Sequence, residues 1–299
     1  MTNKPILFVT SNLSRGIVSC ARAVAKRGFS VAVASPASKN AQYLLEIPHL
    51  RLCKFGIFGK QFLFQTKGMR DYIKKNNPII HTFDDISYKL FATRRPAAIN
   101  HTNLSLGIDL KIYHPDSVSV RRQAQFLDDY NIAPHQKLIT VISPLGAGLD
   151  ALSAAAGGMP RDDFIIALFG ACDRRRAQKL IKATREGPAR DKIIFIGTEQ
   201  DLPSLFRASF ATMSLARHSG RLLKSAVAMA RPTIWGENEY KIAANIPIAD
   251  DSPAAIADAL NTALDLSAAA REAFESKNCA AAKEFSLDRT VEEILGAKK

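Results

Sequence analysis

Residues 210–235 read FATMSLARHSGRLLKSAVAMARPTIW, and this stretch decides the fold class. An apolar run at Phe210–Met213 is followed by a polar loop, a helix-length amphipathic segment at Gly220–Ala230 and a second apolar run at Pro232–Trp235. Short apolar runs joined through one such segment are typical of parallel strands, because those strands are buried on both faces. The stretch therefore predicts a strand–helix–strand unit of a parallel sheet.

The same alternation extends along most of the chain. Six further apolar runs predict strands, and three amphipathic segments between them predict helices. The strands are expected at Ile6–Thr10, Ser30–Ala34, Ile79–Thr82, Leu138–Ile142, Phe164–Phe169 and Lys192–Ile196, and the helices at Gly16–Arg27, Leu149–Ala156 and Arg174–Glu186. From Pro253 onward the pattern is helical, with Ser252 as an N-cap residue. The whole pattern predicts an α/β protein with helices on both faces of parallel sheets.

A chain of 299 residues is long enough for two domains with separate cores. Gly107 and Pro115 interrupt the pattern, so the boundary is expected near Leu106–Pro115. No run of about 18 apolar residues predicts a membrane span, and the first apolar run indicates a strand rather than a signal peptide. The four cysteines form no CxxC pair or Cys/His cluster, which predicts reduced thiols, no structural zinc and a cytoplasmic location.

The net charge of +13 is unevenly distributed. Residues 1–110 hold 16 Lys or Arg and 5 Asp or Glu, a net charge of +11, which leaves +2 for residues 111–299. Such an asymmetry indicates an anionic partner for the N-terminal half: a membrane surface, an acidic or phosphorylated acceptor, or nucleic acid. A merely solvated basic surface is the alternative. Nucleic acid is not expected, because the basic residues are not interleaved with aromatic ones and no recognition motif is present.

Loops that follow strands are the candidate sites, because ligands of open α/β sheets bind at the carboxyl ends of the strands. In the N-terminal half, Ser14, Arg15 and Gly16 form a loop that allows close backbone approach and offers a cation to an acceptor. Further along, His81 and Asp84 are candidates for acid–base catalysis. Each feature also has an ordinary structural explanation, as a helix cap, a turn or a buried histidine.

Two loops stand out in the C-terminal half. Ser143–Gly148 contains glycines that suit either phosphate oxygens or a packing turn, and it has no Lys or Arg. The loop from Arg217 onward runs into a helix N-terminus, where Arg217, Ser219 and Arg221 converge. A helix N-terminus with two arginines stabilises a diphosphate, and this interpretation is favoured over the alternative of a solvated basic helix start.

Four segments in order resemble motifs of the retaining GT-B glycosyltransferases, the group 1 or family 4 type that includes bacterial lipopolysaccharide enzymes. They are GIDLKIYHPD at 107–116, IFIGTEQDLPSLF at 194–206, SAVAMARPTI at 225–234 and EFSLDRT at 284–290, and PIIH at 78–81 is similar to a fifth motif. The resemblance implies two Rossmann-like domains facing across a cleft, with the N-terminal domain shortened. It also implies an acceptor-side domain at 1–106, a nucleotide-sugar-binding domain at 107–277 and a helix at 278–299 that returns to the first domain.

The resemblance implies a set of residues for binding the donor nucleotide and its diphosphate. They are Gly197, Arg217, Ser219, Gly220, Arg221, Leu222, Lys224 and Ser225. The chain departs from the family at its catalytic motifs. Arg217 and Ser225 stand where the family has two glutamates, and Pro144 and Ala147 stand where an arginine and a lysine clamp the diphosphate. We hypothesise that the cations around Arg217 supply the charge missing from that loop.

The resemblance implies a glycosyltransferase of hexosyl type that moves a sugar from a nucleotide-diphosphate donor to a glycan or lipid-linked acceptor. Synthesis of lipopolysaccharide or another surface polysaccharide is the expected setting, at the inner face of the membrane, with no cofactor and no metal. The replaced residues favour the alternative of an inactive GT-B-like subunit that binds or assembles other components.

Overall fold

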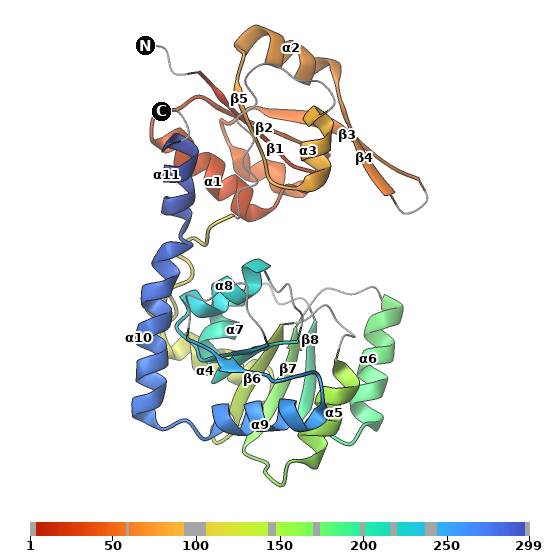
Figure 1. Ribbon diagram of the computed structural model, residues 1–299, viewed down its shortest axis with the longest axis vertical. Helices are drawn as coiled ribbons and strands as arrows, with labels where there is room; N and C mark the ends of the chain where they lie inside the picture. Colours follow the sequence, from red (N-terminus) through yellow and green to blue (C-terminus); the bar gives the residue numbers. More distant parts are fainter. Residues whose placement is uncertain are drawn as a thin grey trace. The chain divides into compact units, whose positions relative to one another are not determined.

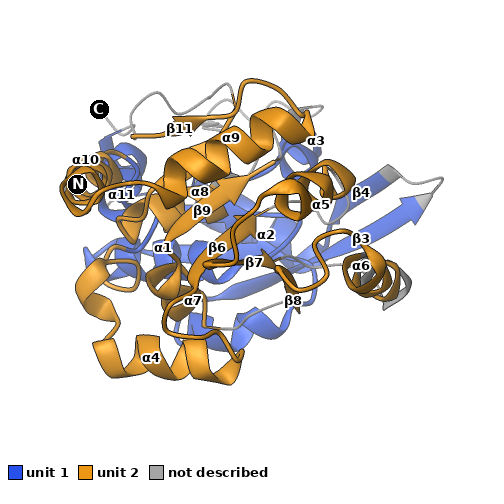
Figure 2. Ribbon diagram, turned by 90° about the horizontal axis from the view of Figure 1, so that it is seen from below, with its two compact units in different colours: residues 1–109, 285–299 blue, residues 110–284 orange. Residues whose placement is uncertain are grey.

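The computed structural model describes residues 4–57, 60–92, 106–142, 148–169, 174–197, 201–215, 220–236 and 244–296. The chain forms two compact units, which Figure 2 colours separately. The first unit comprises residues 1–109 and 285–299, and the second comprises residues 110–284. Both units are α/β structures, as the sequence predicts.

The sheet of the first unit has the strand order β4-β3-β2-β1-β5. Its strands are β1 (Ile6–Val9), β2 (Val31–Ser35), β3 (His49–Ile57), β4 (Lys60–Gln65) and β5 (Ile79–Thr82). Neighbouring strands are parallel except at the edge, where β4 runs antiparallel to β3. Strands β3 and β4 were not predicted, and the antiparallel pair corrects the expectation of a purely parallel sheet. Whether this domain is shortened stays a prediction.

Helices cover both faces of this sheet (Figure 1). On one face, helix α1 (Arg15–Lys26), the 3-10 helix η1 (Lys39–Leu44) and helix α11 (Leu287–Gly296) pack against Ile6 and Phe8. On the other face, α2 (Lys67–Asn76) and α3 (Asp85–Ala92) pack against Leu7 and Val9. Because side chains alternate along a strand, β1 contributes to the apolar cores on both faces of the sheet.

The second unit contains a six-stranded parallel sheet with the order β11-β10-β9-β6-β7-β8. Its strands are β6 (Lys137–Ile142), β7 (Phe164–Phe169), β8 (Ile193–Gly197), β9 (Ala211–Ser214), β10 (Thr233–Trp235) and β11 (Ile246–Pro247). Numbered along the chain, this is the order 3-2-1-4-5-6 of a doubly wound Rossmann sheet. The two-residue strand β11 was not predicted.

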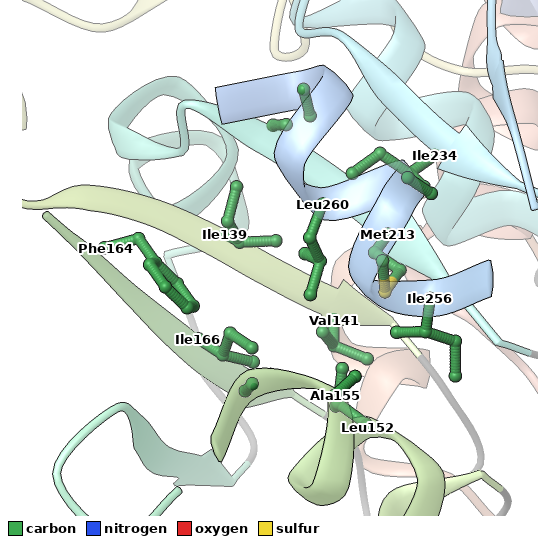
Figure 3. Close-up of a cluster of buried hydrophobic side chains, with 14 of the residues drawn as sticks. Ile139, Val141, Leu152, Ala155, Phe164, Ile166, Met213, Ile234, Ile256 and Leu260 are labelled. Atoms are coloured by element: carbon green, nitrogen blue, oxygen red, sulfur yellow. The ribbon is translucent and has the colours of Figure 1, made fainter. Parts of the chain in front are cut away.

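Seven α-helices and the 3-10 helix η2 (Pro115–Ser117) belong to the described part of this unit. The α-helices are α4 (Val120–Asp129), α5 (Leu149–Gly158), α6 (Arg174–Glu186), α7 (Leu202–Ala208), α8 (Gly220–Ala228), α9 (Pro253–Leu264) and α10 (Ala268–Glu284). Figure 3 shows the larger core, where α5 and α9 pack on strand residues such as Ile139 and Phe164. Residues of α4 and α7, such as Phe126 and Leu205, form a second cluster with other strand residues.

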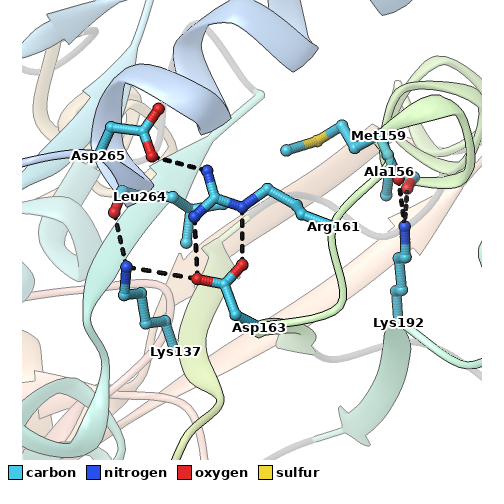
Figure 4. Close-up of polar contacts among 8 residues, drawn as sticks. All are labelled: Lys137, Ala156, Met159, Arg161, Asp163, Lys192, Leu264 and Asp265. Carbon is cyan, nitrogen blue, oxygen red and sulfur yellow. Dashed lines mark hydrogen bonds and ion pairs between the residues drawn. The ribbon is translucent and has the colours of Figure 1, made fainter.

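A network of charged side chains lies at the amino ends of β6, β7 and β8 (Figure 4). Arg161 donates two hydrogen bonds to Asp163 and, together with Lys137, lowers the pKa of this carboxyl group to about 2; a third hydrogen bond of Arg161 goes to Asp265. Lys137 binds the carbonyl at the end of α9, and Lys192 binds two carbonyls at the end of α5. The network lies at the opposite end of the strands from the carboxyl ends that bind ligands, and it caps helix C-termini.

The predicted boundary at 277/278 differs from the observed one at 284/285 because α10 is anchored in the second unit. Asn278, fully buried, donates to the carbonyl of Arg231 and accepts from the amide of Ala244. The buried Arg231 guanidinium binds Glu275 of the same helix at 3.0 Å, and burial lowers the pKa of this arginine to about 10. A helix held by these contacts belongs to the second unit along its whole length.

The segment at Gly107 lies beside the start of α11, so two of the resembling motifs meet within the first unit. The Gly107 amide donates to Thr290 Oγ1 at 3.0 Å, and Ile108 exchanges backbone hydrogen bonds with Phe285 and Leu287. A Cβ atom at position 107 would lie 2.6 Å from Thr290 Oγ1 and still closer to the carbonyl of Ser286. Glycine is therefore required at this position.

Among the described helices, none is long and apolar enough to cross a membrane.

Candidate functional site

The strand order of the second unit reverses between β6 and β9, and such a switch point is where open α/β sheets bind ligands. The two strands end side by side, because Ile142 pairs with Ser214. Beyond these ends, Gly148 lies against Leu215, with 3.2 Å between an ideal Cβ at 148 and Leu215 Cδ1. The two loops singled out in the C-terminal half therefore begin side by side, and the first loop ends against the start of the second, although residues 143–147 and 216–219 are outside the described residues.

The predicted donor-binding residues fall into two groups, those in or just before α8 and Gly197, which lies elsewhere on the sheet edge. Gly220 is the first residue of α8, followed by the half-buried Arg221 and Leu222, and then by Lys224 and Ser225, which are 8% and 1% exposed. Leu222 packs against two apolar clusters, which is a structural role. Arg217 and Ser219 lie outside the described residues. Among the described candidates, Arg221 is therefore the cation with the more accessible side chain.

Gly197 lies apart from the start of α8 along the sheet edge. It ends β8, and β6 and β7 lie between β8 and β9. The chain next leads to Asp201, which caps α7 by accepting from Ser204 and binds Arg122 at 2.6 Å. Arg122, Asp201 and Ser204, but not Gly197, are among the residues that line a pocket of about 590 Å³ between the starts of α4 and α7. Sequence reasoning missed this pocket, because the pairing of Arg122 with Asp201 spans 79 residues.

Helix α8 ends in a strained residue. Ala230 has a φ of 60°, in the left-handed region that favours glycine. The Ala230 amide donates to the Val227 carbonyl, and the Arg231 amide reaches the Ala226 carbonyl at 3.5 Å. These are the two hydrogen bonds of a Schellman motif, in which the left-handed position is usually glycine.

Replacing Ala230 with glycine is expected to stabilise the second unit by about 0.5–1 kcal/mol, because the penalty of the Cβ atom is removed. Ala228→Gly, two residues earlier inside α8, is the matched control and is expected to destabilise by about 1 kcal/mol. Urea unfolding followed by the fluorescence of Trp235, the single tryptophan, measures both changes in this unit. Equal destabilisation by the two substitutions would contradict the assignment of Ala230 to the left-handed position of a Schellman motif.

The first unit also has a switch point, between β1 and β5, and Asp84 joins the two loops there. Its carboxylate accepts from the Ser11 amide at 2.7 Å and the Thr10 hydroxyl at 3.1 Å. It also accepts from the amide and hydroxyl of Ser87, both at 2.8 Å, in the position of an N-cap of α3. Burial alone raises the pKa of Asp84, but these hydrogen bonds outweigh burial and hold the pKa below its ordinary value. Asp84 is thus a satisfied carboxylate in a structural position.

His81 lies inside the sheet. Its side chain is 0% exposed, and its ring packs edge-on against Phe8 of the neighbouring strand, with 6.0 Å between ring centroids. A catalytic histidine must reach the proton that it transfers. The structural alternative for His81 is therefore favoured, and its catalytic role stays a prediction.

The acceptor-side loop forms the start of α1. Ser14 caps the helix by accepting from the Ile17 amide, and Gly16 is buried. Arg15 is exposed, and its guanidinium lies over the ring of Tyr43, 5.2 Å from the centroid. A cation opposes the helix dipole at this end, so an anion bound there would gain from both the cation and the helix N-terminus. Tyr43 was missed because no sequence pattern links it to Arg15.

Within the described residues, no group of three or more His, Cys, Asp or Glu side chains is arranged to hold a metal ion.

No protein-family model matches the chain, and no curated protein matches it in sequence.

Solved structures are similar to the chain over its whole length. A glycosyltransferase from Rickettsia africae matches 99% of this chain and 98% of its own, with a TM-score of 0.78 and 14% identity. HepE from Anabaena, in complex with UDP and glucose, matches 98% and 99%, with a TM-score of 0.67 and 14% identity. WaaG, a glycosyltransferase involved in lipopolysaccharide biosynthesis, matches 97% and 100%, with a TM-score of 0.60 and 16% identity.

These similarities establish the fold. The chain has two Rossmann-like α/β units, whose strands are parallel except for the edge strand β4, and it matches structures of GT-B glycosyltransferases from end to end. This confirms the predicted fold class. The activity and the site residues are a separate question, because one fold carries many functions.

Proposed function

We propose that the chain is a glycosyltransferase of hexosyl type, which transfers a sugar from a nucleotide-diphosphate donor to a glycan or lipid-linked acceptor. One observation carries the proposal: the second unit has the 3-2-1-4-5-6 sheet, with α5 and α8 starting at its switch point. The match to HepE, whose structure contains UDP and glucose, supports a nucleotide-sugar donor. The match to WaaG supports lipopolysaccharide or other surface polysaccharide as the setting, and the retaining, family 4 type is part of the proposal.

In this proposal the donor diphosphate binds at the start of α8. Backbone amides from Gly220 onward and the cations Arg217 and Arg221 would stabilise the negative charge that develops on the leaving diphosphate. Lys224 and Ser225 would support this helix start from its buried side. The proposal includes no cofactor and no metal, because the helix N-terminus and the arginines supply positive charge.

The acceptor would bind to the first unit. Arg15 is exposed at the start of α1 and suits an anionic or lipid-linked acceptor, with Ser14 and Gly16 shaping the backbone around it. Asp84 would act as a positioning residue that holds this loop through Ser11. We further propose that the protein works in the cytoplasm at the inner face of the membrane, where lipid-linked acceptors and anionic lipids occur together.

A second candidate is an inactive binding or assembly subunit with the same fold. Three observations favour it. His81 is buried, and all the hydrogen bonds of Asp84 described above are structural, which leaves the first unit without an evident general base among the predicted residues. In the second unit, Ser225, which replaces a family glutamate, is 1% exposed.

Nucleotide binding tests the proposal. A saturating nucleotide diphosphate is expected to raise the Tm by about 5 °C or more, because binding to the native state alone stabilises it. UDP and GDP are the first probes, with and without a chelator, which we expect to make no difference. Arg221→Glu is expected to remove most of the shift, and Arg121→Glu, an exposed position on α4 with the same change of charge, is expected to keep it.

Sugar transfer then separates the two candidates. A nucleotide-induced shift together with hydrolysis of, or transfer from, one nucleotide sugar of a panel supports the enzyme. A shift without any turnover supports the binding subunit. No shift with any nucleotide would rule out the proposed donor site.

A further inference from the structure

The edge of the first unit carries a two-stranded ribbon formed by β3 and β4. Figure 1 shows the pair extending from the rest of the sheet. The strands pair antiparallel, with Phe55 opposite Phe62 and Cys53 opposite Phe64. Residues directly opposite each other, and those two apart along a strand, share a face. Phe55, Phe62 and Phe64 therefore lie on one face, which we call the aromatic face of the ribbon.

The opposite face of the ribbon is covered at Leu52 and Leu63, where the ribbon joins the rest of the sheet. Leu52 and Leu63 are 5% and 7% exposed and pack in the core with Met69 of α2 and Phe91 of α3. Antiparallel sheets with one packed face normally carry polar residues on the other. Here the other face carries aromatic side chains that helices α1 and η1 do not cover.

The aromatic face is exposed to solvent. Phe55, Phe62 and Phe64 are 53%, 45% and 54% exposed, and they are three of the eight large apolar side chains classed as exposed in the described part of the chain. Single exposed apolar residues are ordinary, but three gathered on one small face mark an interaction surface. The ten residues Phe55–Phe64 contain one charged side chain, that of Lys60.

Positive charge is concentrated on the ribbon and on α2, which packs against its opposite face. Residues 49–76 contain seven Lys or Arg against a single Asp, a net charge of +6, nearly half of the +13 of the whole chain. Arg51 is exposed on the aromatic face and Lys54 on the opposite face of the ribbon, and Lys67, Arg70 and Lys74 are exposed on α2, which directly follows the ribbon. The partner must therefore offer both an apolar layer and negative charge.

We propose that the aromatic face of the ribbon docks onto a membrane surface that contains anionic lipids. Phenylalanine side chains bury in the acyl boundary of a bilayer, while nearby Lys and Arg bind the anionic headgroups. A second copy of the chain fits poorly, because two ribbons of the same positive charge would repel each other. The inference deepens the peripheral location in the proposed function, but it is argued from the ribbon alone.

Single-stranded nucleic acid is the competing partner, because the cation Arg51 and the exposed aromatic side chains share one face of the ribbon, as on a stacking surface. The sequence-based reason for excluding nucleic acid overlooked this ribbon, since β3 and β4 were not predicted. The membrane is favoured because the stretch between Phe55 and Phe64 is dominated by apolar residues, whereas a strand of nucleic acid needs cations along its whole path.

Vesicle binding by the full chain tests the inference. The wild type is expected to co-sediment with phosphatidylcholine vesicles that contain about 30% phosphatidylserine, and to bind about tenfold more weakly without the anionic lipid or at high salt. The variant with Phe55→Ser, Phe62→Ser and Phe64→Ser is expected to lose at least about tenfold in partitioning. Arg51→Glu with Lys54→Glu is expected to weaken binding to anionic vesicles only.

Matched controls keep the test specific. Ile112→Ser with Val120→Ser removes two exposed apolar side chains, 47% and 82% exposed, from the second unit and is expected to bind vesicles as the wild type does. Circular dichroism checks that every variant is folded. Equal vesicle binding by the wild type and the three-phenylalanine variant overturns the inference. So does a preference for oligo(dT) over vesicles, or self-association that requires the phenylalanines.

Failure here is distinguishable from failure of the proposed function. A chain that binds a nucleotide diphosphate but no vesicle overturns only the docking surface. A chain that binds vesicles through the ribbon but no nucleotide overturns only the donor site.

Discussion

The substitution Gly107→Ala is expected to detach α11 from the rest of the first unit. The new Cβ atom would overlap the Ser286 backbone and lie 2.6 Å from Thr290 Oγ1. Backbone atoms cannot move aside as a flexible side chain does, so the paired segments at Ile108 and Leu287 must separate. We expect a loss of about 2–3 kcal/mol, in the upper range for overpacking.

Hydrogen exchange measures this loss locally. Amides of α11, whose Val291 and Ile294 are fully buried, are expected to exchange about 30-fold faster or more in the variant. Gly68→Ala in α2 is the matched control, because no atom lies within 4 Å of a Cβ there, and helix propensity makes it neutral or stabilising. Unchanged protection of α11 in the Gly107 variant would contradict the account of this junction.

Removing the Asp84 carboxylate is the second large effect. Asp84→Ala leaves the amides of Ser11 and Ser87 without their acceptor, and both loops at the switch point of the first unit lose their connection. Loss of several hydrogen bonds to one charged group is expected to cost about 2–3 kcal/mol. Asp71→Ala, an exposed position on α2, is expected to stay within about 0.5 kcal/mol of the wild type.

The effect of Asp84 depends on pH in a defined direction. Its pKa is lower in the folded than in the unfolded protein, so its ionised form stabilises the fold. The full contribution is present above the ordinary pKa of aspartate, about 4, and is lost as the pH falls through the folded value. Urea unfolding at pH 7 and pH 3, followed by circular dichroism, should show a smaller gap between wild type and Asp84→Ala at the lower pH. A gap that widens in acid would contradict this account.

The sequence predicts the buried strands well, because continuous apolar runs such as Phe164–Phe169 are buried on both faces. Because the prediction depends on such regular patterns, it misses the ribbon formed by β3 and β4. In β3 and β4 phenylalanines stand at the outward positions 55, 62 and 64, while Lys54 and Gln61 stand on the face that carries Leu52 and Leu63, so neither a buried nor a half-buried strand pattern is recognised. The second unit holds α10 through Asn278 and Glu275, contacts between residues far apart in the chain that no local pattern reveals.

The candidate loops were predicted from the ends of strands, but which loops lie together depends on the order of the strands in each sheet. Only the order of each sheet shows that the loops form pairs, at β6 with β9 and at β1 with β5. The side-chain roles were harder to predict. Asp84 looked catalytic because a carboxylate follows a strand, yet the spacing to Ser87 is that of a helix cap. The burial of His81 follows from its register against Phe8, which is a tertiary property.

The first unit is discontinuous in sequence, and this has a consequence for biosynthesis. A ribosome releases residues 1–109 first, then the whole second unit, and only afterwards the residues of α11. Until that helix emerges, apolar side chains of the first unit such as Ile17 and Val18 lack the partners Val291 and Ile294. The second unit, continuous from Leu110 to Glu284, has no such delay and can complete its core earlier. The nascent first unit therefore keeps apolar side chains exposed for longer than the second unit does.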